Sequence, residues 1–273
     1  FDLCIVDEAS KATPTEILVP MARSKKWVLV GDPKQLPPFI EQEFLADKDI
    51  VDEFGLSIDD LRITVLERVL DRLPNESKKK LRKQYRMVEG IGDLVSSCFY
   101  NGDLQSPKKT SDLDLKPSFA YPVTWLTTSS LKNPFESTSG SSFQNKCEAE
   151  IVSKVLDRIE FVAKAKKRKT SIAVIAGYTG QVAAIKRVIE KQIRSSKWLH
   201  ISCNTVDAFQ GRQADICIYS VTRSNRHRRI GFLREFPRLN VALSRAKSHL
   251  IIIGDHLFCR SAKGQNPFID VIT

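Results

Sequence analysis

The segment IAVIAGYTGQVAAIKRVIEKQIRSSKWLHISCNT, residues 172–205, decides the fold class of this chain. It begins and ends with short apolar runs, Ile172–Ala176 and Leu199–Thr205, that are typical of strands. Between them, residues 180–193 place apolar side chains at helical spacing. A strand, a helix and a second strand in this order indicate parallel strands joined by a helical crossover.

The same alternation extends in both directions along the chain. Further strands are predicted at residues 1–6, 27–31, 123–127, 216–221 and 250–254, the first of them buried. Helices are predicted at residues 15–23, 57–83, 90–99, 144–164 and 237–246. The polar segments 105–118 and 129–142 are predicted to be loops. Together these elements predict a doubly wound α/β fold, with parallel sheets flanked by helices and a boundary between two units near residues 75–84.

Composition narrows the class of partner. The chain has 273 residues, with 43 Lys or Arg and 32 Asp or Glu, and a formal net charge of +11. Such an excess favours a polyanion, nucleic acid first and an anionic membrane surface second. No run of about 18 apolar residues is present, so no membrane-spanning helix is predicted.

The six cysteines lie far apart and form no C-x-x-C pair. This spacing argues against a structural zinc site. It favours a reducing intracellular setting, cytoplasmic or nuclear if the source is eukaryotic.

Polar residues follow the first two predicted strands. Asp7 and Glu8 lie in IVDEAS, residues 5–10, and Gln35 lies in VGDPKQLPP, residues 30–38. Ligands of parallel sheets bind at the carboxyl ends of the strands. Asp7 is therefore a candidate to hold Mg²⁺, usually through water, and Glu8 to orient or deprotonate an attacking water. Taken alone, the two stretches also fit an acidic helix start and a proline-rich turn.

DEAS, residues 7–10, followed by GDPKQLPP, residues 31–38, resembles motifs II and III of superfamily 1 nucleic-acid helicases. The likeness is greatest to the group that contains the nonsense-mediated-decay helicase and senataxin. The later motifs follow in order: QYRM (84–87) resembles motif IV, NTVDAFQGRQADI (204–216) motif V and RLNVALSRAKSHLIIIGD (238–255) motif VI. The matches span nearly the whole chain.

The resemblance implies a RecA-like P-loop NTPase fold. Residues 1–80 would be the end of a first RecA-like domain and residues 81–273 a complete second one, with ATP and Mg²⁺ between them. The implied activity is that of an ATP-dependent helicase or translocase on single-stranded DNA or RNA, moving 5′-to-3′.

The resemblance also implies roles for individual residues. Gln35 would contact the nucleotide, Tyr85 would stack on its base and Arg86 would contact a phosphate. Arg245 would be the arginine finger, because a second cation at the γ-phosphate neutralises charge that develops in the transition state. The alternatives are a surface arginine on a helix for Arg245 and a solvated arginine beside a domain boundary for Arg86.

Motif V and its surroundings carry candidates for both ligands. Gly211 permits close approach of the backbone to the nucleotide. Thr205 resembles the hydroxyl that holds a nucleic-acid phosphate, although it also fits an ordinary strand residue. Tyr178 is a candidate to pack near the nucleic-acid backbone, with a core tyrosine as the alternative. Arg223 opens the basic run RSNRHRR and is a candidate to line the nucleic-acid channel.

Two positions depart from the pattern of the family. Gln213 stands where the family usually has Glu. If this position binds the nucleotide ribose, the amide still accepts a hydrogen bond but the negative charge is lost. Gly177 stands where Pro usually precedes the tyrosine.

One part of an ATP site is missing from the sequence. No G-x-x-x-x-G-K followed by Ser or Thr occurs in the chain. We therefore expect the phosphate loop in an upstream part of the same polypeptide, which fits a first residue, Phe1, that is not Met. On this interpretation the chain alone hydrolyses ATP barely or not at all.

Two other classes of function stay open. A degenerate motor would bind nucleic acid or a partner without turnover; Asp7, Glu8 and Arg245 argue against it, while Gln213 favours it. A nuclease is the second alternative, since such motors are often fused to one. No nuclease carboxylate cluster is recognisable in the sequence.

Overall fold

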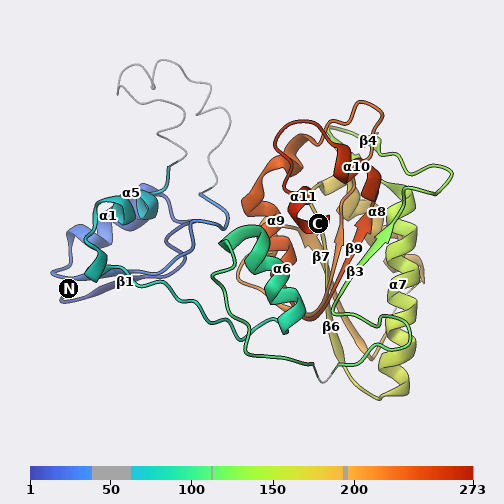
Figure 1. Ribbon diagram of the computed structural model, residues 1–273, viewed down its shortest axis with the longest axis horizontal. Coiled ribbons are helices and arrows are strands. Elements are labelled where there is room, and N and C mark those ends of the chain that lie inside the picture. Colours follow the sequence, from blue (N-terminus) through green and yellow to red (C-terminus); the bar gives the residue numbers. More distant parts are fainter. Residues whose placement is uncertain (39–62, 112, 193–195, 273) are drawn as a thin grey trace. The chain divides into compact units, whose positions relative to one another are not determined.

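A computed structural model describes residues 1–38, 63–111, 113–192 and 196–272. Its contacts divide the chain into two compact units, Phe1–Leu81 and Arg82–Thr273 (Figure 1). Residues 57–62, where the predicted helix 57–83 begins, lie outside the described residues.

The first unit is built on two parallel strands, β1 (Cys4–Val6) and β2 (Trp27–Leu29). They are connected through helix α1 (Pro14–Ala22), and helix α5 (Val65–Arg72) and a 3₁₀ turn (Asn75–Ser77) follow later. Helix α5 begins where it does because Thr64 and Glu67 cap each other. Glu67 N–H donates to the Thr64 hydroxyl at 3.1 Å, and Thr64 N–H donates to the Glu67 carboxylate at 2.8 Å.

Two predictions for this unit were wrong in part. Strand β1 is not buried on both faces, because side chains alternate along a strand and the small core lies on one side. Val6 packs against that core, whereas Ile5 is 65% exposed. The predicted helical segment 57–83 is interrupted at Pro74, as its sequence indicates, because Leu73 precedes a proline and has an extended backbone; after the 3₁₀ turn Asn75–Ser77, residues 78–83 are not helical.

The second unit is built on a five-stranded parallel sheet, as predicted. Its strands are β3 (Val123–Thr127), β6 (Thr170–Ala176), β7 (Leu199–Thr205), β8 (Ala214–Ser220) and β9 (Ala246–Gly254). Their order across the sheet is β3-β9-β8-β6-β7. All four neighbouring pairs are parallel.

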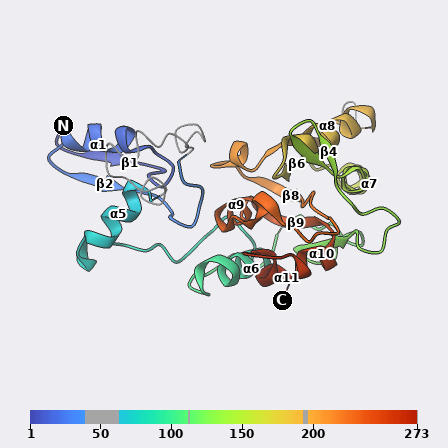
Figure 2. The same ribbon diagram turned by 90° about the horizontal axis from the view of Figure 1, so that it is seen from above.

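Helices cover both faces of this sheet (Figure 2). One face carries α7 (Lys146–Ala165) and α8 (Thr179–Gln192). The other carries α6 (Glu89–Tyr100) and α9 (Phe236–Leu243), with α10 (His256–Ser261) and α11 (Phe268–Ile272) beside them. The main core lies between α7, α8 and the sheet and includes Leu156, Ile172 and Ile218. The α/β architecture with flanking helices is therefore confirmed.

Two details of the second unit differ from prediction. The predicted loop 129–142 contains most of an antiparallel hairpin, β4 (Ser137–Ser139) and β5 (Ser142–Gln144). Strand β9 begins at Ala246, which pairs with Ala214, instead of at residue 250. Polar residues at 247–249 hid this start in the sequence; His249 is nevertheless buried, with its ring nitrogens near the Leu113 and Tyr121 carbonyls. No described helix is both long and apolar enough to cross a membrane.

Since the strands are parallel, the sheet has an amino edge, where every strand begins, and a carboxyl edge, where every strand ends. Ala214 lies opposite Ala246 at the amino edge. Ala176 lies opposite both Thr205 and Ser220 at the carboxyl edge. The candidate residues of the second unit lie near one or the other of these two edges.

Candidate functional site

In the first unit, the two polar segments singled out by the sequence lie side by side. Val30 N–H donates to the Val6 carbonyl at 2.8 Å, and Ala9 N–H donates to the Val30 carbonyl at 2.9 Å. A side chain at Gly31 would not fit here, because its Cβ would lie 2.9 Å from the Ser10 nitrogen. The stretch after β1 and the stretch after β2 are thus held together at the carboxyl ends of both strands.

The candidate side chains of this unit are exposed or half-buried. Asp7 and Glu8 are both exposed, and Asp7 Oδ1 accepts a hydrogen bond from Glu8 N–H at 2.9 Å. Glu8 has a φ of 54°, a conformation that is uncommon for a residue other than glycine and that clusters at functional sites. Gln35 is half-buried and donates from Nε2 to Asp32 Oδ2 at 3.0 Å.

In the second unit, two candidate arginines converge on one residue at the amino edge. Arg86 Nη1 donates to the Ser244 carbonyl at 3.2 Å, and Arg245 Nη2 donates to the Ser244 hydroxyl at 2.8 Å. Guanidinium groups always carry their charge and present a fork of donors. The two groups hold the same residue, Arg86 through its backbone carbonyl and Arg245 through its hydroxyl.

Arg245 is not the surface residue that the alternative required. It is 1% exposed and lies between the end of α9 and the start of β9. Its Nε donates to the Val241 carbonyl at 2.8 Å and its Nη1 to the Arg212 carbonyl at 3.2 Å. The side chain therefore links helix α9 to the residues that precede β8.

The other nucleotide candidates of this unit are sequence neighbours of Arg86 or of Arg212, whose carbonyl Arg245 contacts. Tyr85, next to Arg86, is 71% exposed. Gly211 has a φ of 75°, and no atom lies within 4 Å of where its Cβ would be. Gln213 is exposed and directly precedes β8. These candidates therefore precede the amino ends of strands, whereas Asp7 and Glu8 follow the carboxyl end of β1.

The nucleic-acid candidates lie at the opposite, carboxyl edge. Thr205 ends β7 and is half-buried. Tyr178 follows β6, and Arg223 follows β8. Residues 206–213 run from the carboxyl end of β7 to the amino end of β8, so motif V contributes candidates to both edges.

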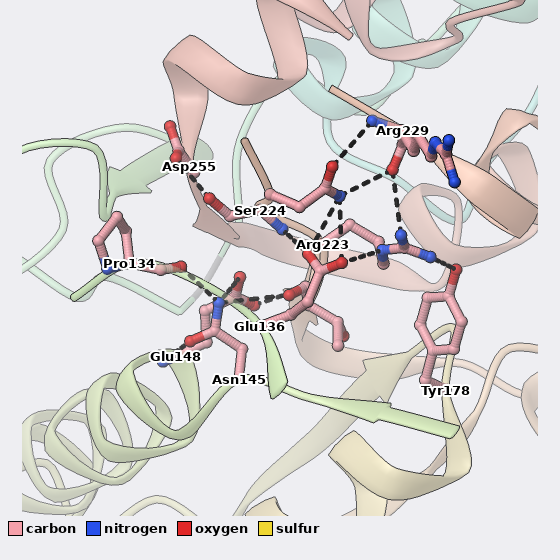
Figure 3. Close-up of polar contacts among 11 residues, drawn as sticks. Pro134, Glu136, Asn145, Glu148, Tyr178, Arg223, Ser224, Arg229 and Asp255 are labelled. Atoms are coloured by element: carbon pink, nitrogen blue, oxygen red, sulfur yellow. Dashed lines mark hydrogen bonds and ion pairs between the residues drawn. The ribbon is translucent and has the colours of Figure 1, made fainter. Parts of the chain in front are cut away.

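Arg223 is buried in a network that holds Tyr178 (Figure 3). Its Nε lies 2.9 Å from Glu136 Oε1, and its Nη1 donates to the Tyr178 hydroxyl at 3.0 Å. The guanidinium also lies 4.2 Å from the centre of the Phe143 ring. Only 7% of Arg223 is exposed. Arg223 is therefore a buried residue that contacts Glu136, Phe143 and the Tyr178 hydroxyl.

Sequence reasoning missed the residues that support this edge. Thr222 has a φ of 74°, which is a strained value for a β-branched residue. Both of its backbone groups are held at the start of α7: its N–H donates to Glu148 Oε2 at 2.8 Å, and its carbonyl accepts from Asn145 Nδ2 at 3.2 Å. The N-x-x-E spacing of Asn145 and Glu148 before an apolar helix was the available signal, since it marks a helix start.

Burial also changes the ionisation of this network. Burial raises the pKa of Glu148 to about 8, although hydrogen bonds from Ser220 and Thr222 lower it. Burial likewise raises the pKa of Glu136, opposed by the neighbouring Arg223 charge. Two buried carboxyl groups therefore hold residues at the carboxyl edge: Glu148 contacts Thr222, and Glu136 contacts Arg223.

Comparison with known proteins agrees with the motifs. A family model described as an AAA domain matches residues 61–257, and a second model with the same description matches residues 1–43. DNA polymerase alpha-associated DNA helicase A of Saccharomyces cerevisiae is 33% identical over 93% of this chain, which spans 38% of that relative. A regulator of nonsense transcripts 1 homolog of Drosophila melanogaster is 34% identical over 93% of this chain, which spans 21% of it.

A solved complex of an arterivirus helicase with DNA aligns over 91% of this chain and 38% of its own, with 15% identity and a TM-score of 0.42. The chain spans well under half of each of these proteins. The match over residues 61–257 covers most of the chain, and the motifs occur in the order of the family. The chain belongs to the AAA-domain family of superfamily 1 helicases.

Proposed function

We propose that this chain is part of an ATP-dependent helicase or translocase that acts on single-stranded nucleic acid. The observation that carries the proposal is the pair of arginines, Arg86 and Arg245, that converge on Ser244. Phosphoryl transfer is catalysed almost entirely by positioning and by neutralising charge on the phosphates. A preorganised pair of cations would neutralise the charge on the phosphates. Movement in the 5′-to-3′ direction is part of the proposal and rests on the motif resemblance alone.

The first unit would supply the remaining polar groups of the ATP site. Asp7 would hold Mg²⁺ through water, Glu8 would orient the attacking water and Gln35 would contact the γ-phosphate. Exposed Asp7 suits this ion, since Mg²⁺ binds through one or two carboxylates, waters and substrate phosphates and needs no cage of protein ligands. When bound, the ion neutralises phosphate charge.

In the second unit, Tyr85 would stack on the adenine base, Gly211 would let the backbone approach the nucleotide and Gln213 would accept a hydrogen bond from the ribose. Arg86 and Arg245 would contact the γ-phosphate. A phosphate loop from a part of the polypeptide outside these 273 residues would complete the site, because the sequence contains none.

The carboxyl edge of the second unit would hold the nucleic acid. Thr205 would bind a backbone phosphate, and Tyr178 would pack against the strand. Arg223 would act as a positioning residue, since its guanidinium is buried between Glu136 and Tyr178. The six free cysteines accord with a reducing intracellular location.

Binding of labelled single-stranded DNA and RNA to the chain tests this placement by fluorescence anisotropy. Thr205→Val keeps the shape of the side chain but removes the hydroxyl, and we expect affinity to fall roughly fivefold to tenfold. Thr127→Val is the matched control. Thr127 ends β3, and β3 and β7 are the two outermost strands of the sheet, on opposite sides of its three central strands. Equal affinity for Thr205→Val and the control would contradict the placement.

A further inference from the structure

An exposed aromatic side chain lies directly beside the Tyr178 network. Phe135 is 40% exposed and precedes Glu136, whose carboxylate pairs with Arg223. The Arg226 guanidinium lies 5.5 Å from the centre of the Phe135 ring. Tyr178, Arg223 and Glu136 are linked by side-chain contacts (Figure 3), and Phe135 adjoins them as the residue before Glu136.

A small surface pocket opens next to this ring. Its volume is about 220 Å³, and its lining residues are Asn133, Phe135, Glu136, Ser137, Lys146 and Cys147. This volume is below the roughly 300–1,000 Å³ typical of pockets for drug-sized ligands. The mixture of one aromatic ring, amide and hydroxyl groups and a lysine suits a single planar, polar group.

The loop beside the pocket is basic and ordered by its own hydrogen bonds. Asn225 Oδ1 accepts from Arg229 N–H at 3.0 Å, and Asn225 Nδ2 donates to the Arg229 carbonyl at 2.9 Å. The loop between them exposes Arg226 and Arg228, and Arg229 is exposed as well. No carboxylate in the described part of the chain forms an ion pair with these three arginines. Positive charge is thus available next to an exposed ring.

We propose that Phe135, Arg226 and Lys146 form an additional nucleotide subsite for a single strand, next to the Tyr178 region. One base would stack on the Phe135 ring at the pocket, and Arg226 and Lys146 would hold the adjoining phosphates. Bases of a single strand offer their faces to aromatic side chains, whereas those of a duplex are stacked on each other. The subsite rests on the proposed function and extends the path of the strand by about one nucleotide.

Phe135→Ala and Arg226→Ala, made in the full chain, test the subsite against labelled oligothymidylates of about 5 and about 15 nucleotides. Because stacking on one aromatic ring has a large effect on affinity, we expect Phe135→Ala to weaken binding of the longer strand on the order of tenfold. The shorter strand should be affected less, because it can bind at the proposed Thr205 and Tyr178 contacts without reaching Phe135. Phe135→Trp should restore affinity, and Arg226→Ala should reduce the salt dependence of binding by about one ion.

Phe161→Ala is the matched control, since Phe161 is 75% exposed on α7 far from its first turn. Thermal unfolding of each variant checks that the fold is retained. If Phe135→Ala binds the long strand as tightly as the control while Thr205→Val is impaired, the subsite is refuted and the proposed function stands. If the unaltered chain binds no single strand, the proposed function fails first. Tight binding of duplex that depends equally on Phe135 would also refute a single-strand subsite.

Protection of Cys147 gives a second readout that does not depend on affinity. Cys147 lines the pocket and is half-buried, as Cys98 is on α6. A saturating long oligonucleotide should slow maleimide labelling of Cys147 several-fold and leave Cys98 unchanged. Equal labelling of Cys147 with and without the strand would overturn the proposal.

Discussion

At the scale of single residues, Glu148 shows how burial changes the behaviour of a charge. The side chain is fully buried, and its hydrogen-bond partners are the neutral groups of Ser220, Thr222 and Asn145. Removing a carboxylate from water without a cation disfavours its charged form. Its pKa is therefore raised from 4.5 to about 8. The neutral acid is the form that the fold prefers.

This shift makes stability depend on pH. Because the pKa is raised on folding, the folded chain holds the proton more tightly, and the free energy of unfolding should decrease between about pH 4.5 and about pH 8. Glu148→Gln imitates the neutral acid and should remove most of this decrease. Urea unfolding at mildly acidic and mildly alkaline pH measures it. A variant as sensitive to pH as the original chain would show that another group is responsible.

Arg223 and Glu136 form a buried pair in which each charge depends on the other. Arg223→Met should destabilise the chain by about 3–5 kcal/mol, because it leaves a buried carboxylate without its cation. The double substitution Arg223→Met with Glu136→Gln should recover a large part of that loss. A double-mutant cycle from urea unfolding supplies the numbers. Additive effects of the two substitutions would mean that the pair does not couple.

At the scale of elements, Asn145 joins helix α7 to the end of β8. Its Oδ1 caps the helix by accepting from Glu148 N–H at 3.2 Å. Its Nδ2 donates to the Pro134 carbonyl at 2.8 Å and to the Thr222 carbonyl at 3.2 Å. One side chain therefore starts a helix and also fixes the strained residue that precedes Arg223.

The two tasks of Asn145 can be separated. Asn145→Ala should cost about 2–4 kcal/mol, since it removes a cap and leaves two buried carbonyls without a donor. Asn145→Ser keeps an oxygen for the cap and should cost about half as much. Thermal and urea unfolding compare the two variants. Equal losses would assign the whole effect to the carbonyl contacts.

Elements with strong periodicity were predictable from the sequence. Strands β3 and β7 have the predicted bounds, and helix α6 differs from prediction by one residue at each end. The hairpin β4–β5 was missed because its residues are mostly Ser and Thr, which are typical of loops as well. Periodicity reports burial of apolar side chains, and this hairpin buries few.

At the scale of the whole molecule, the candidates of the second unit separate to opposite edges of one sheet. The seven residues of β6 make this separation roughly 20 Å. A nucleotide at Arg245 and a strand at Thr205 would not touch each other within this unit. Two segments connect the edges and could carry coupling between them: residues 206–213, and the stretch from the end of β8 through α9 to Arg245.

The motifs were enough to predict the family and the candidate residues but not their surroundings. Arg223 and Arg245 have the sequence context of ligand-binding arginines, yet they are 7% and 1% exposed. The partners of Arg245 are mainly backbone carbonyls, and a sequence carries no sign of these. Glu136 lies 87 residues before Arg223, so their pairing depends on the complete fold.

The first whole-molecule expectation concerns the chain by itself. Without a phosphate loop in its sequence, the 273-residue chain should hydrolyse ATP barely or not at all. A coupled assay under excess ATP measures the rate. Multiple turnover that Glu8→Gln abolishes would contradict this expectation.

The most direct test of the proposed motor is ATP hydrolysis by a polypeptide that joins this chain to its phosphate loop, with and without single-stranded DNA and RNA. We expect nucleic acid to stimulate hydrolysis and Arg245→Ala to reduce it by about 10³-fold or more, while Arg158→Ala, at an exposed position of α7, leaves it unchanged. Matching thermal unfolding of the two variants excludes loss of the fold. A rate that survives Arg245→Ala, or an absence of stimulation while nucleic acid still binds, would contradict the account and favour a binding module without turnover.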